Sequence, residues 1–442
     1  MSRFRNYAEV LAADGDQAPE AFHRHPGVDD APLQVPVAVY TDRAYHEVEK
    51  QRLWSRTWQM ACREEHVPEP GDQYVYDVVD RSYLIVRGGD GRLRAFVNAC
   101  LHRGRRLREY PGRAATIRCP FHAFTWDLEG RIRGIPSRAE FDRHDDTDWQ
   151  LPAVSVGTWG GFVFINPDPS AGPLSDYLGE LPEHFDRWAL QDRCVTTHVV
   201  KLLRCNWKIA QEAFMETYHA HATHPQSAWG SGDGELSQYD AFGHFSRAIT
   251  PRAIPSPHLA GRVPEQRILD GLMTRLSRGE HLAISPGETA RATYARHQRR
   301  ELERSIGRER AAALSTAELC DLLYYTVFPN FHPWGAYYQS VYRFLPNGDD
   351  HRSSRMEFML LSPFEGSRPA PADVVTLGFD DSWTAAVGPR GRIFDQDSLN
   401  MPEVQRGLET TTQRTVRLAE HQEVKIRHFY KCYAKLAGIP ID

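Results

Sequence analysis

The segment CLHRGRRLREYPGRAATIRCPFH, residues 100–122, determines how the rest of the chain is interpreted. It contains two closely spaced pairs of metal-binding residues, Cys100 with His102 and Cys119 with His122, separated by sixteen residues. Each pair supplies one thiolate and one imidazole from a single loop. The gaps of one and two residues within the pairs allow the sulfur and the nitrogen of one loop to reach different metal ions. The spacing therefore predicts a centre with two metal ions, one bound by the sulfurs and the other by the nitrogens.

Two thiolates on one iron and two imidazoles on the other are the ligands of a Rieske [2Fe–2S] cluster. A single tetrahedral zinc ion also binds two cysteines and two histidines, but its ligands usually stand two to four residues apart. The one residue between Cys100 and His102 is cramped for a single ion. We therefore interpret Cys100, His102, Cys119 and His122 as ligands of a [2Fe–2S] cluster, with a zinc-stabilised binding module as the alternative.

The sequence around these ligands resembles the Rieske domain of ring-hydroxylating oxygenase α subunits. The matching segments, within residues 57–166, are TWQMACREEHVPEPGD, VNACLHRGRRL and CPFHAFTWDLEGRI. Rieske electron carriers of quinol oxidase chains have an additional cysteine beside each ligand pair, and these cysteines form a disulfide. Arg105 and Phe121 stand near the ligands here, so that disulfide is absent. Ala123-Phe124 replaces the usual Gly-Trp of the family, and we expect this to alter packing around the cluster rather than ligation.

A second set of ligands lies in NWKIAQEAFMETYHAHATHP, residues 206–225. His219 and His224, with a carboxylate from elsewhere, would form the 2-His-1-carboxylate triad, which leaves positions on Fe(II) open for O2. The pattern predicts a helix over Trp207–Tyr218, and helical spacing places Glu216 and His219 on one face. The proline after His224 favours the end of the helix there, so that His224 can turn back towards the metal.

The order Glu-x2-His-x4-His-Pro after Asn-Trp-Lys resembles the catalytic motif of the same oxygenase family. The resemblance implies that Glu216 links a histidine of the mononuclear iron site to a cluster histidine of the neighbouring subunit. Many members have Asp at this position, and Glu is a known variant with one more methylene of reach. Ala213 replaces the Asn often found after Glu212.

The third iron ligand is expected from FDQDSLNMPEVQRGL, residues 394–408. This segment resembles the carboxylate segment that the family has ahead of a Gln-Arg-Gly-Leu helix start, and alignment on that helix selects Asp397. Asp395 is the alternative ligand. For either residue, a solvated acid at the N-terminus of a helix is the alternative to metal binding.

Short apolar runs separated by turns, from Trp58 to about Pro169, predict a small antiparallel β domain. The later chain is mixed, with two alternating runs around the turn NGDD that predict an antiparallel hairpin. Helical periodicity predicts helices over 42–54, 264–278 and 287–312, and one long closing helix from Val404 to Tyr433. We expect an α+β fold of helix-grip type, in which an antiparallel sheet packs on helices. The expected division is an N-terminal arm and helix (1–56), a Rieske domain (57–168) and a catalytic domain (169–442).

Composition limits the other classes of function. Apolar residues make up 41% and charged residues 25% of the 442 residues, as in globular proteins. The net charge of −5 lacks the basic excess of a nucleic-acid-binding protein. No apolar run approaches the ~18 residues of a membrane span, and the first residues are too polar for a secretory signal. The seven cysteines are an odd number and mostly far apart, which favours a reducing cytoplasm over a disulfide framework.

The resemblance implies the terminal oxygenase component of a multicomponent system. Electrons from NAD(P)H would arrive through a ferredoxin or flavin reductase, pass from the cluster to mononuclear Fe(II), and activate O2 to hydroxylate an aromatic or other hydrophobic substrate. It also implies a homotrimer, or an α3β3 hexamer with a small β subunit. Dioxygenation and monooxygenation, including demethylation of a quaternary amine or a methoxy compound, share these ligands and both stay open. So does an electron carrier without catalysis.

Overall fold

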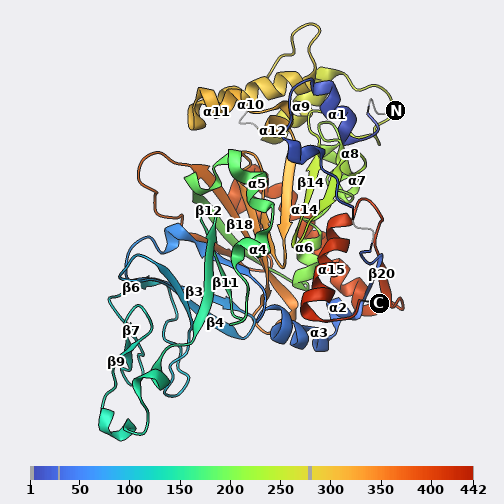
Figure 1. Ribbon diagram of the computed structural model, residues 1–442. Coiled ribbons are helices and arrows are strands. Elements are labelled where there is room, and N and C mark those ends of the chain that lie inside the picture. The colour runs from blue at the N-terminus through green and yellow to red at the C-terminus, as the bar shows by residue number, and fades with distance from the viewer. Residues whose placement is uncertain (1–3, 28–29, 277–280, 442) are drawn as a thin grey trace.

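A long sheet forms the centre of the chain, and a smaller β unit extends from it towards the lower left of Figure 1. The computed structural model describes residues 4–27, 30–276 and 281–441. Within these ranges no helix is long and apolar enough to cross a membrane. The α+β class predicted from the sequence is confirmed, because helices and largely antiparallel sheets share the chain.

The smaller unit contains a seven-stranded sheet, in the order β2-β11-β10-β5-β4-β3-β6, and a three-stranded sheet, β7-β8-β9. The strands are β2 Gln59–Arg63, β3 Asp72–Val78, β4 Arg81–Arg87, β5 Leu93–Val97, β6 Gly112–Arg113, β7 Ile117–Arg118, β8 Thr125–Trp126, β9 Ile132–Gly134, β10 Ala153–Trp159 and β11 Phe162–Asn166. Strands β3 and β4 form a hairpin with Tyr76 opposite Tyr83. At the tip of the unit, the Trp126 indole donates a hydrogen bond to the Trp149 carbonyl at 2.6 Å, which fixes a small aromatic core behind the ligand loops.

The larger sheet has eight strands in the order β13-β14-β15-β16-β17-β18-β12-β19. The strands are β12 Arg193–Leu203, β13 Gln238–Ala241, β14 Phe245–Thr250, β15 Leu322–Val327, β16 Phe331–Pro333, β17 Ser340–Asn347, β18 Asp350–Pro363 and β19 Val374–Leu377. Neighbouring strands are antiparallel except β12 and β19, which run parallel. Strands β17 and β18 are the predicted hairpin, with Phe344 opposite Met356.

Three helices that surround the candidate iron site pack on this sheet or on one another. Helix α6 (Trp207–Glu212) packs on β17 and β18, α15 (Val424–Ala437) packs on β13 and β14, and α14 (Gly391–Thr410) packs on α6. The Asn206 side chain accepts the Lys208 backbone N–H and so begins α6. The buried aromatic rings of Trp207, Phe394 and Phe429, one from each helix, belong to one apolar core.

Two of the predicted helical segments are found with minor changes. The segment 42–54 contains α3 (Arg43–Val48) and the π-helical turn η2 (Glu49–Leu53), and the segment 264–278 contains α9 (Glu265–Leu276). Residues 277–278 of that prediction lie outside the described residues. The segment 287–312 is divided into α10 (Ala290–Ile306) and α11 (Arg308–Ala312) by Gly307, whose φ of 82° interrupts a helix. The remaining elements are β1 Gln34–Pro36, β20 Thr415–Arg417, α1 Tyr7–Asp14, η1 Glu20–His23, α2 Ala38–Thr41, η3 Glu64–His66, η4 Arg138–Phe141, η5 Asp146–Trp149, α4 Leu174–Leu178, α5 Leu181–Phe185, η6 Asp186–Trp188, η7 Leu190–Asp192, α7 Ala220–Thr223, η8 Pro225–Ser227, α8 Asp233–Leu236, α12 Thr316–Cys320, α13 Trp383–Val387 and η9 Gly388–Arg390.

The helix predicted over Trp207–Tyr218 is wrong in its second half, because α6 ends at Glu212. Met215 is fully buried in the core, and the Glu216 carboxylate accepts the backbone N–H of His219 at 3.0 Å. A side-chain acceptor for that N–H replaces the carbonyl that a continuing helix would supply. Glu216 and His219 therefore meet through a turn rather than across a helix face.

The single closing helix is also wrong, since three elements occupy that segment: α14, the strand β20 and α15. Strand β20 pairs antiparallel with β1, with Pro36 opposite Thr415. The run of three β-branched threonines at 410–412 weakens helix formation where α14 ends. Pairing with a strand almost 400 residues away overrides the helical period that continues through this region.

A buried ion pair holds the smaller unit against the larger sheet. Arg343 of β17 pairs with Glu357 of β18 at 2.5 Å, and both side chains are at least 90% buried. The same guanidinium donates to the backbone carbonyls of Met60 and Ala61 on β2 at 2.6 and 2.8 Å. One arginine thus satisfies acceptors on both units.

Candidate metal centres

The two ligand loops of the smaller unit are built in the same way. The Cys100 N–H donates to the Arg105 carbonyl and the Cys119 N–H donates to the Phe124 carbonyl, both at 2.8 Å. In each loop the N–H four residues after the cysteine donates back to the cysteine carbonyl. That fourth position has a left-handed backbone in both loops, with φ of 73° at Gly104 and 61° at Ala123. The alanine that replaces the usual glycine therefore occupies a conformation that favours glycine.

The predicted cluster ligands of the two loops approach one another in pairs, thiol with thiol and imidazole with imidazole. The Cys100 and Cys119 side chains are buried, and the His102 and His122 rings lie 4.8 Å apart between centroids. Among the described residues, the buried Nδ1 of His102 has no hydrogen-bond partner. The His102 ring also stacks on Phe124 at 4.8 Å.

A bound metal would satisfy this orphaned nitrogen. Burial raises the pKa of the Cys100 thiol, so a metal is also what would favour its thiolate form. Two buried thiols and two facing imidazoles thus fit a [2Fe–2S] cluster.

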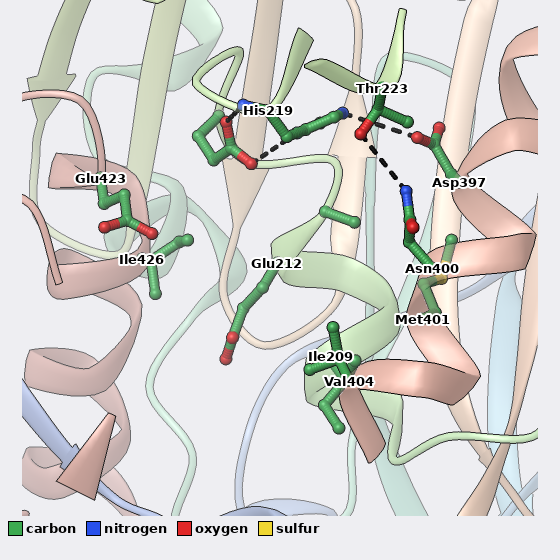
Figure 2. Close-up of a pocket in the computed structure, with 12 residues that line it drawn as sticks. Ile209, Glu212, His219, Thr223, Asp397, Asn400, Met401, Val404, Glu423 and Ile426 are labelled. Atoms are coloured by element: carbon green, nitrogen blue, oxygen red, sulfur yellow. Dashed lines mark hydrogen bonds and ion pairs between the residues drawn. The ribbon is translucent and has the colours of Figure 1, made fainter. Parts of the chain in front are cut away.

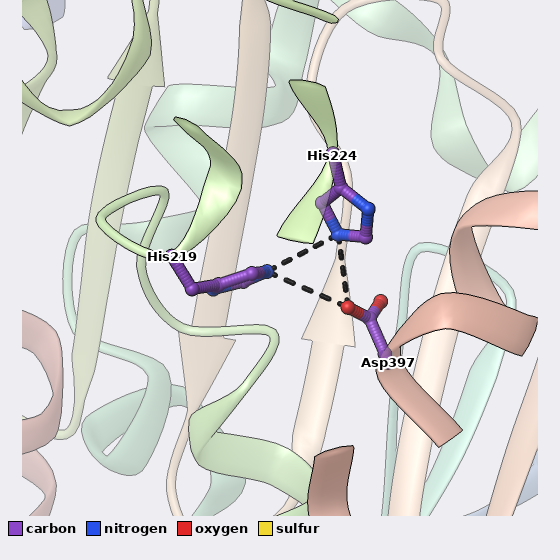
Figure 3. Close-up of side chains that lie close together, drawn as sticks. All are labelled: His219, His224 and Asp397. Atoms are coloured by element: carbon purple, nitrogen blue, oxygen red, sulfur yellow. Dashed lines mark hydrogen bonds and ion pairs between the residues drawn. The ribbon is translucent and has the colours of Figure 1, made fainter. Parts of the chain in front are cut away.

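The second site joins residues that are 178 positions apart in sequence, as Figure 3 shows. His219 precedes the short helix α7, His224 follows it, and Asp397 comes from α14. The Nε2 atoms of His219 and His224 lie 3.2 Å apart. The Oδ1 atom of Asp397 lies 3.5 Å from the Nε2 atom of His219 and 2.9 Å from the Nε2 atom of His224. His224 leaves the helical conformation, with ψ of 56°, immediately before the proline. Their ligand atoms lie within 4.8 Å of one another, which fits one metal ion bound by two imidazoles and a carboxylate.

Hydrogen bonds of the other ring nitrogen, Nδ1, orient both imidazoles. The Nδ1 of His219 lies 2.6 Å from Glu216 Oε1, and the Nδ1 of His224 lies 2.9 Å from Gln396 Oε1. With Nδ1 protonated and donating, each Nε2 is free to bind a metal. Burial alone would lower the pKa of His219, but its hydrogen bonds to Asp397 and Glu216 raise that pKa to about 10. The role of Gln396 was not predicted from the sequence; its only signal was its place next to Asp397.

Asp395 is directed elsewhere. Its carboxylate accepts the backbone N–H groups of Trp383 and Thr384, at 2.7 and 3.1 Å, and the Ser382 hydroxyl at 2.8 Å. These bonds stabilise the N-terminus of α13. The sequence instead predicted a solvated acid at the start of its own helix, which is wrong because α14 already begins at Gly391. Asp397, in contrast, faces the two histidines.

A cavity of about 220 Å³ adjoins His219 and Asp397, and Figure 2 shows the side chains that line it. It is bounded by Ile209, Glu212, Ala213, Glu216, His219, Thr223, Asp397, Asn400, Met401, Val404, Glu423 and Ile426. Three of these residues are glutamates, so the approach to the candidate iron site from this side is acidic.

Comparison with known proteins identifies both domains. Residues 57–153 match the Rieske [2Fe-2S] domain, and residues 182–438 match the ring hydroxylating alpha subunit (catalytic domain). Curated relatives include the carnitine monooxygenase oxygenase subunit of Acinetobacter pittii, 29% identical over 52% of this chain and 60% of that one. The chlorobenzene dioxygenase subunit alpha of a Cupriavidus species is 32% identical over 42% of this chain and 43% of its own. The chain thus spans about 60% or less of the length of these relatives.

Solved structures show the same fold over a greater length. A quaternary ammonium Rieske monooxygenase superimposes with a TM-score of 0.66 at 20% identity, covering 96% of this chain and 99% of that chain. A naphthalene 1,2-dioxygenase gives 0.65 at 19% identity, covering 92% and 93%. Since the catalytic-domain match alone covers more than half of the residues and follows a Rieske domain, the chain belongs to the ring-hydroxylating oxygenase α subunit family.

Proposed function

We propose that this chain is the terminal oxygenase component of a Rieske system, which inserts oxygen from O2 into an aromatic or other hydrophobic organic substrate. The observation that carries the proposal is the convergence of His219, His224 and Asp397 in a chain with a separate Cys2His2 centre. An iron bound by these three residues would keep open positions for O2. The electrons would come from NAD(P)H through a ferredoxin, a flavin reductase or both.

The proposed ligands are Cys100, His102, Cys119 and His122 for the [2Fe–2S] cluster, and His219, His224 and Asp397 for the mononuclear iron. The hydrogen bonds of His224 to Gln396 and of His219 to Glu216 support the second set, because they fix the ring orientations. We further propose that the chain divides into an arm and helix (1–56), a Rieske domain (57–168) and a catalytic domain (169–442). The two matched segments fall within the last two ranges.

Electron transfer would cross a subunit boundary. Figure 1 places the tip with β7 and β9 and the helix α7 on opposite sides of the molecule. A homotrimer, alone or with a small β subunit, would bring the tip of one subunit to the catalytic domain of the next. Glu216 suits the bridge, since it binds His219 and lines the cavity. Its carboxylate has about four lone-pair sites, so it can also accept from a second imidazole.

A second candidate is monooxygenation of a quaternary amine. It is favoured by the similarity to carnitine and glycine betaine monooxygenase oxygenase subunits, the latter 27% identical over 57% of this chain. The site residues are compatible with either substrate class.

The test is product analysis with ¹⁸O2. The purified chain, its iron restored, is supplied with NADH and a reductase and offered aromatic compounds and quaternary amines. We expect ¹⁸O in the product of at least one class, and none from His219→Ala. Electron consumption without ¹⁸O in any organic product, across the panel, would contradict the proposed function.

A further inference from the structure

Two of the three glutamates that line the cavity have no role in the proposed iron site. Glu216 is engaged by His219, whereas Glu212 comes from the end of α6 and Glu423 from the residue before α15. All three line the same cavity. Figure 2 shows Glu212 and Glu423 at separate places in its lining, with Glu212 directed away from Asp397. Two carboxyl groups thus face a cavity that also reaches the iron-binding residues.

Glu212 is held by two tyrosine hydroxyls. Tyr430 donates to its Oε1 at 2.5 Å, and Tyr40 lies 3.1 Å from both carboxylate oxygens. A tyrosine hydroxyl can donate to a carboxylate or accept from a carboxylic acid, so this trio accommodates Glu212 with or without its proton. An ordinary structural ion pair would hold only the charged form.

In the parts of the chain that the structure describes, Glu212 forms no ion pair. Lys208, on the same helix, is bound to Glu49 at 2.5 Å. Glu423, the remaining acidic group beside it, adds negative charge. Burial, the largest effect, raises the pKa of Glu212 to about 8, although the two tyrosines and Lys208 act in the opposite direction. A pKa in this range favours the protonated form of Glu212 at neutral pH.

Glu423 lines the same cavity, and its charge acts on Glu212 while that of Glu216 acts on Glu423. Glu423 and Glu212 are both partly buried. Burial raises the pKa of Glu423 as well, against one hydrogen bond from the Ala419 N–H. A cavity of about 220 Å³ has room for several waters, at roughly 30 Å³ each. Water in the cavity would connect the two carboxyl groups with the iron-binding residues.

We propose that Glu212 supplies protons for oxygen reduction, and that Glu423 returns them from solvent through the same cavity. The inference rests on the proposed function. Monooxygenation consumes one O2, two electrons and two protons: the O–O bond breaks, one oxygen enters a C–H bond of the substrate, and the other leaves as water with both protons. Dioxygenation to a cis-diol also takes up two electrons and two protons. The electrons come from the reductase, and each proton leaves the Glu212 O–H, whose carboxylate then regains one from Glu423.

The first test does not depend on turnover. Infrared titration of the iron-loaded protein should show a protonated-carboxyl band that disappears as the pH rises through about 8. Glu212→Gln should lack this band, and Glu403→Gln, an exposed acid of α14, should retain it. Tyr430→Phe removes a hydrogen bond that favours the carboxylate, so the midpoint should move to higher pH. A band that titrates with the ordinary carboxylic acids, or persists in Glu212→Gln, overturns the proposal.

The second test measures product formation on a substrate that the wild type oxidises. With both metal centres loaded, Glu212→Gln should lose at least about 100-fold in rate, as expected when a proton donor is removed. The wild-type rate should fall above about pH 8. Glu212→Asp should regain part of the activity and should show the same kind of fall at high pH. In Tyr430→Phe the pH of this fall should move together with the midpoint of the infrared titration. An unchanged rate and pH profile in Glu212→Gln overturns the inference. If the wild type oxygenates nothing, the proposed function fails instead, whatever the infrared result.

Discussion

Replacing Glu216 with glutamine tests whether this residue bridges the two metal centres in addition to supporting His219. In this chain both carboxylate oxygens are used by His219, one by Nδ1 at 2.6 Å and the other by the backbone N–H at 3.0 Å. A glutamine can accept only through its single carbonyl oxygen. Its NH2 group, which has two N–H donors, would then face an N–H group of His219 that is also a donor. We expect Glu216→Gln to keep the cluster and the iron ligands, because Glu216 is not proposed as a ligand, but to lose one charge-assisted hydrogen bond.

That loss is worth about 1.5–3 kcal/mol, or roughly 10- to 150-fold in rate, and more if the bridge to the neighbouring subunit is also broken. The assay mixes a pre-reduced cluster with O2 and a compound that the wild type oxidises, and follows reoxidation of the cluster. Glu216→Asp, which retains the carboxylate, serves as the control and should remain much closer to wild type. Reoxidation at the wild-type rate in Glu216→Gln, with both metals present, would refute the bridge.

Three further outcomes are expected. Asp397→Asn should lose the mononuclear iron with the cluster spectrum intact, whereas Asp395→Asn should retain the iron and lower the melting temperature. Iron analysis of both variants shows which aspartate binds the iron, and the reverse pattern would exchange the two roles. Ala123→Gly should stabilise the smaller unit by about 1 kcal/mol because it relieves a left-handed alanine, which denaturant unfolding can measure; a loss of stability would show that no strain is held there. Arg343→Met should lower the free energy of unfolding by about 3–5 kcal/mol, because a buried carboxylate is left unpaired. Arg352→Met, which breaks an exposed pair, should lower it by less than about 1 kcal/mol. Similar losses in the two variants would show that burial does not set the strength of these pairs.

The ligand sets could be predicted because their information is local. Cys100 and His102, or His219 and His224, are recognisable from residue type and spacing alone, and the structure brings each set together. Asp397 was reached only through the resemblance, since nothing in its own segment distinguishes it from Asp395. The structure separates them by their surroundings: one faces two histidines, and the other caps a helix.

The remaining features depend on contacts that no local pattern contains. The hydrogen bonds of Glu212 join residues 172 and 218 positions apart, so its partners Tyr40 and Tyr430 could not be predicted. Helical periodicity continues past Glu212 in the sequence, but core burial and the Glu216 carboxylate end the helix there. The pairing of β20 with β1 divides the closing helix in the same way, through a partner at the other end of the chain.

Metal and sulfide analysis of the purified, iron-restored protein tests most directly whether one chain holds a two-iron cluster and a separate mononuclear iron. The ligand sets predict about three irons and two acid-labile sulfides per chain, with a visible spectrum that Cys119→Ser abolishes. His224→Ala should reduce the iron count by one and leave the sulfide and the spectrum unchanged. A colourless protein with zinc bound by the four cysteine and histidine residues, or an iron count of two that His224→Ala does not alter, would contradict the account.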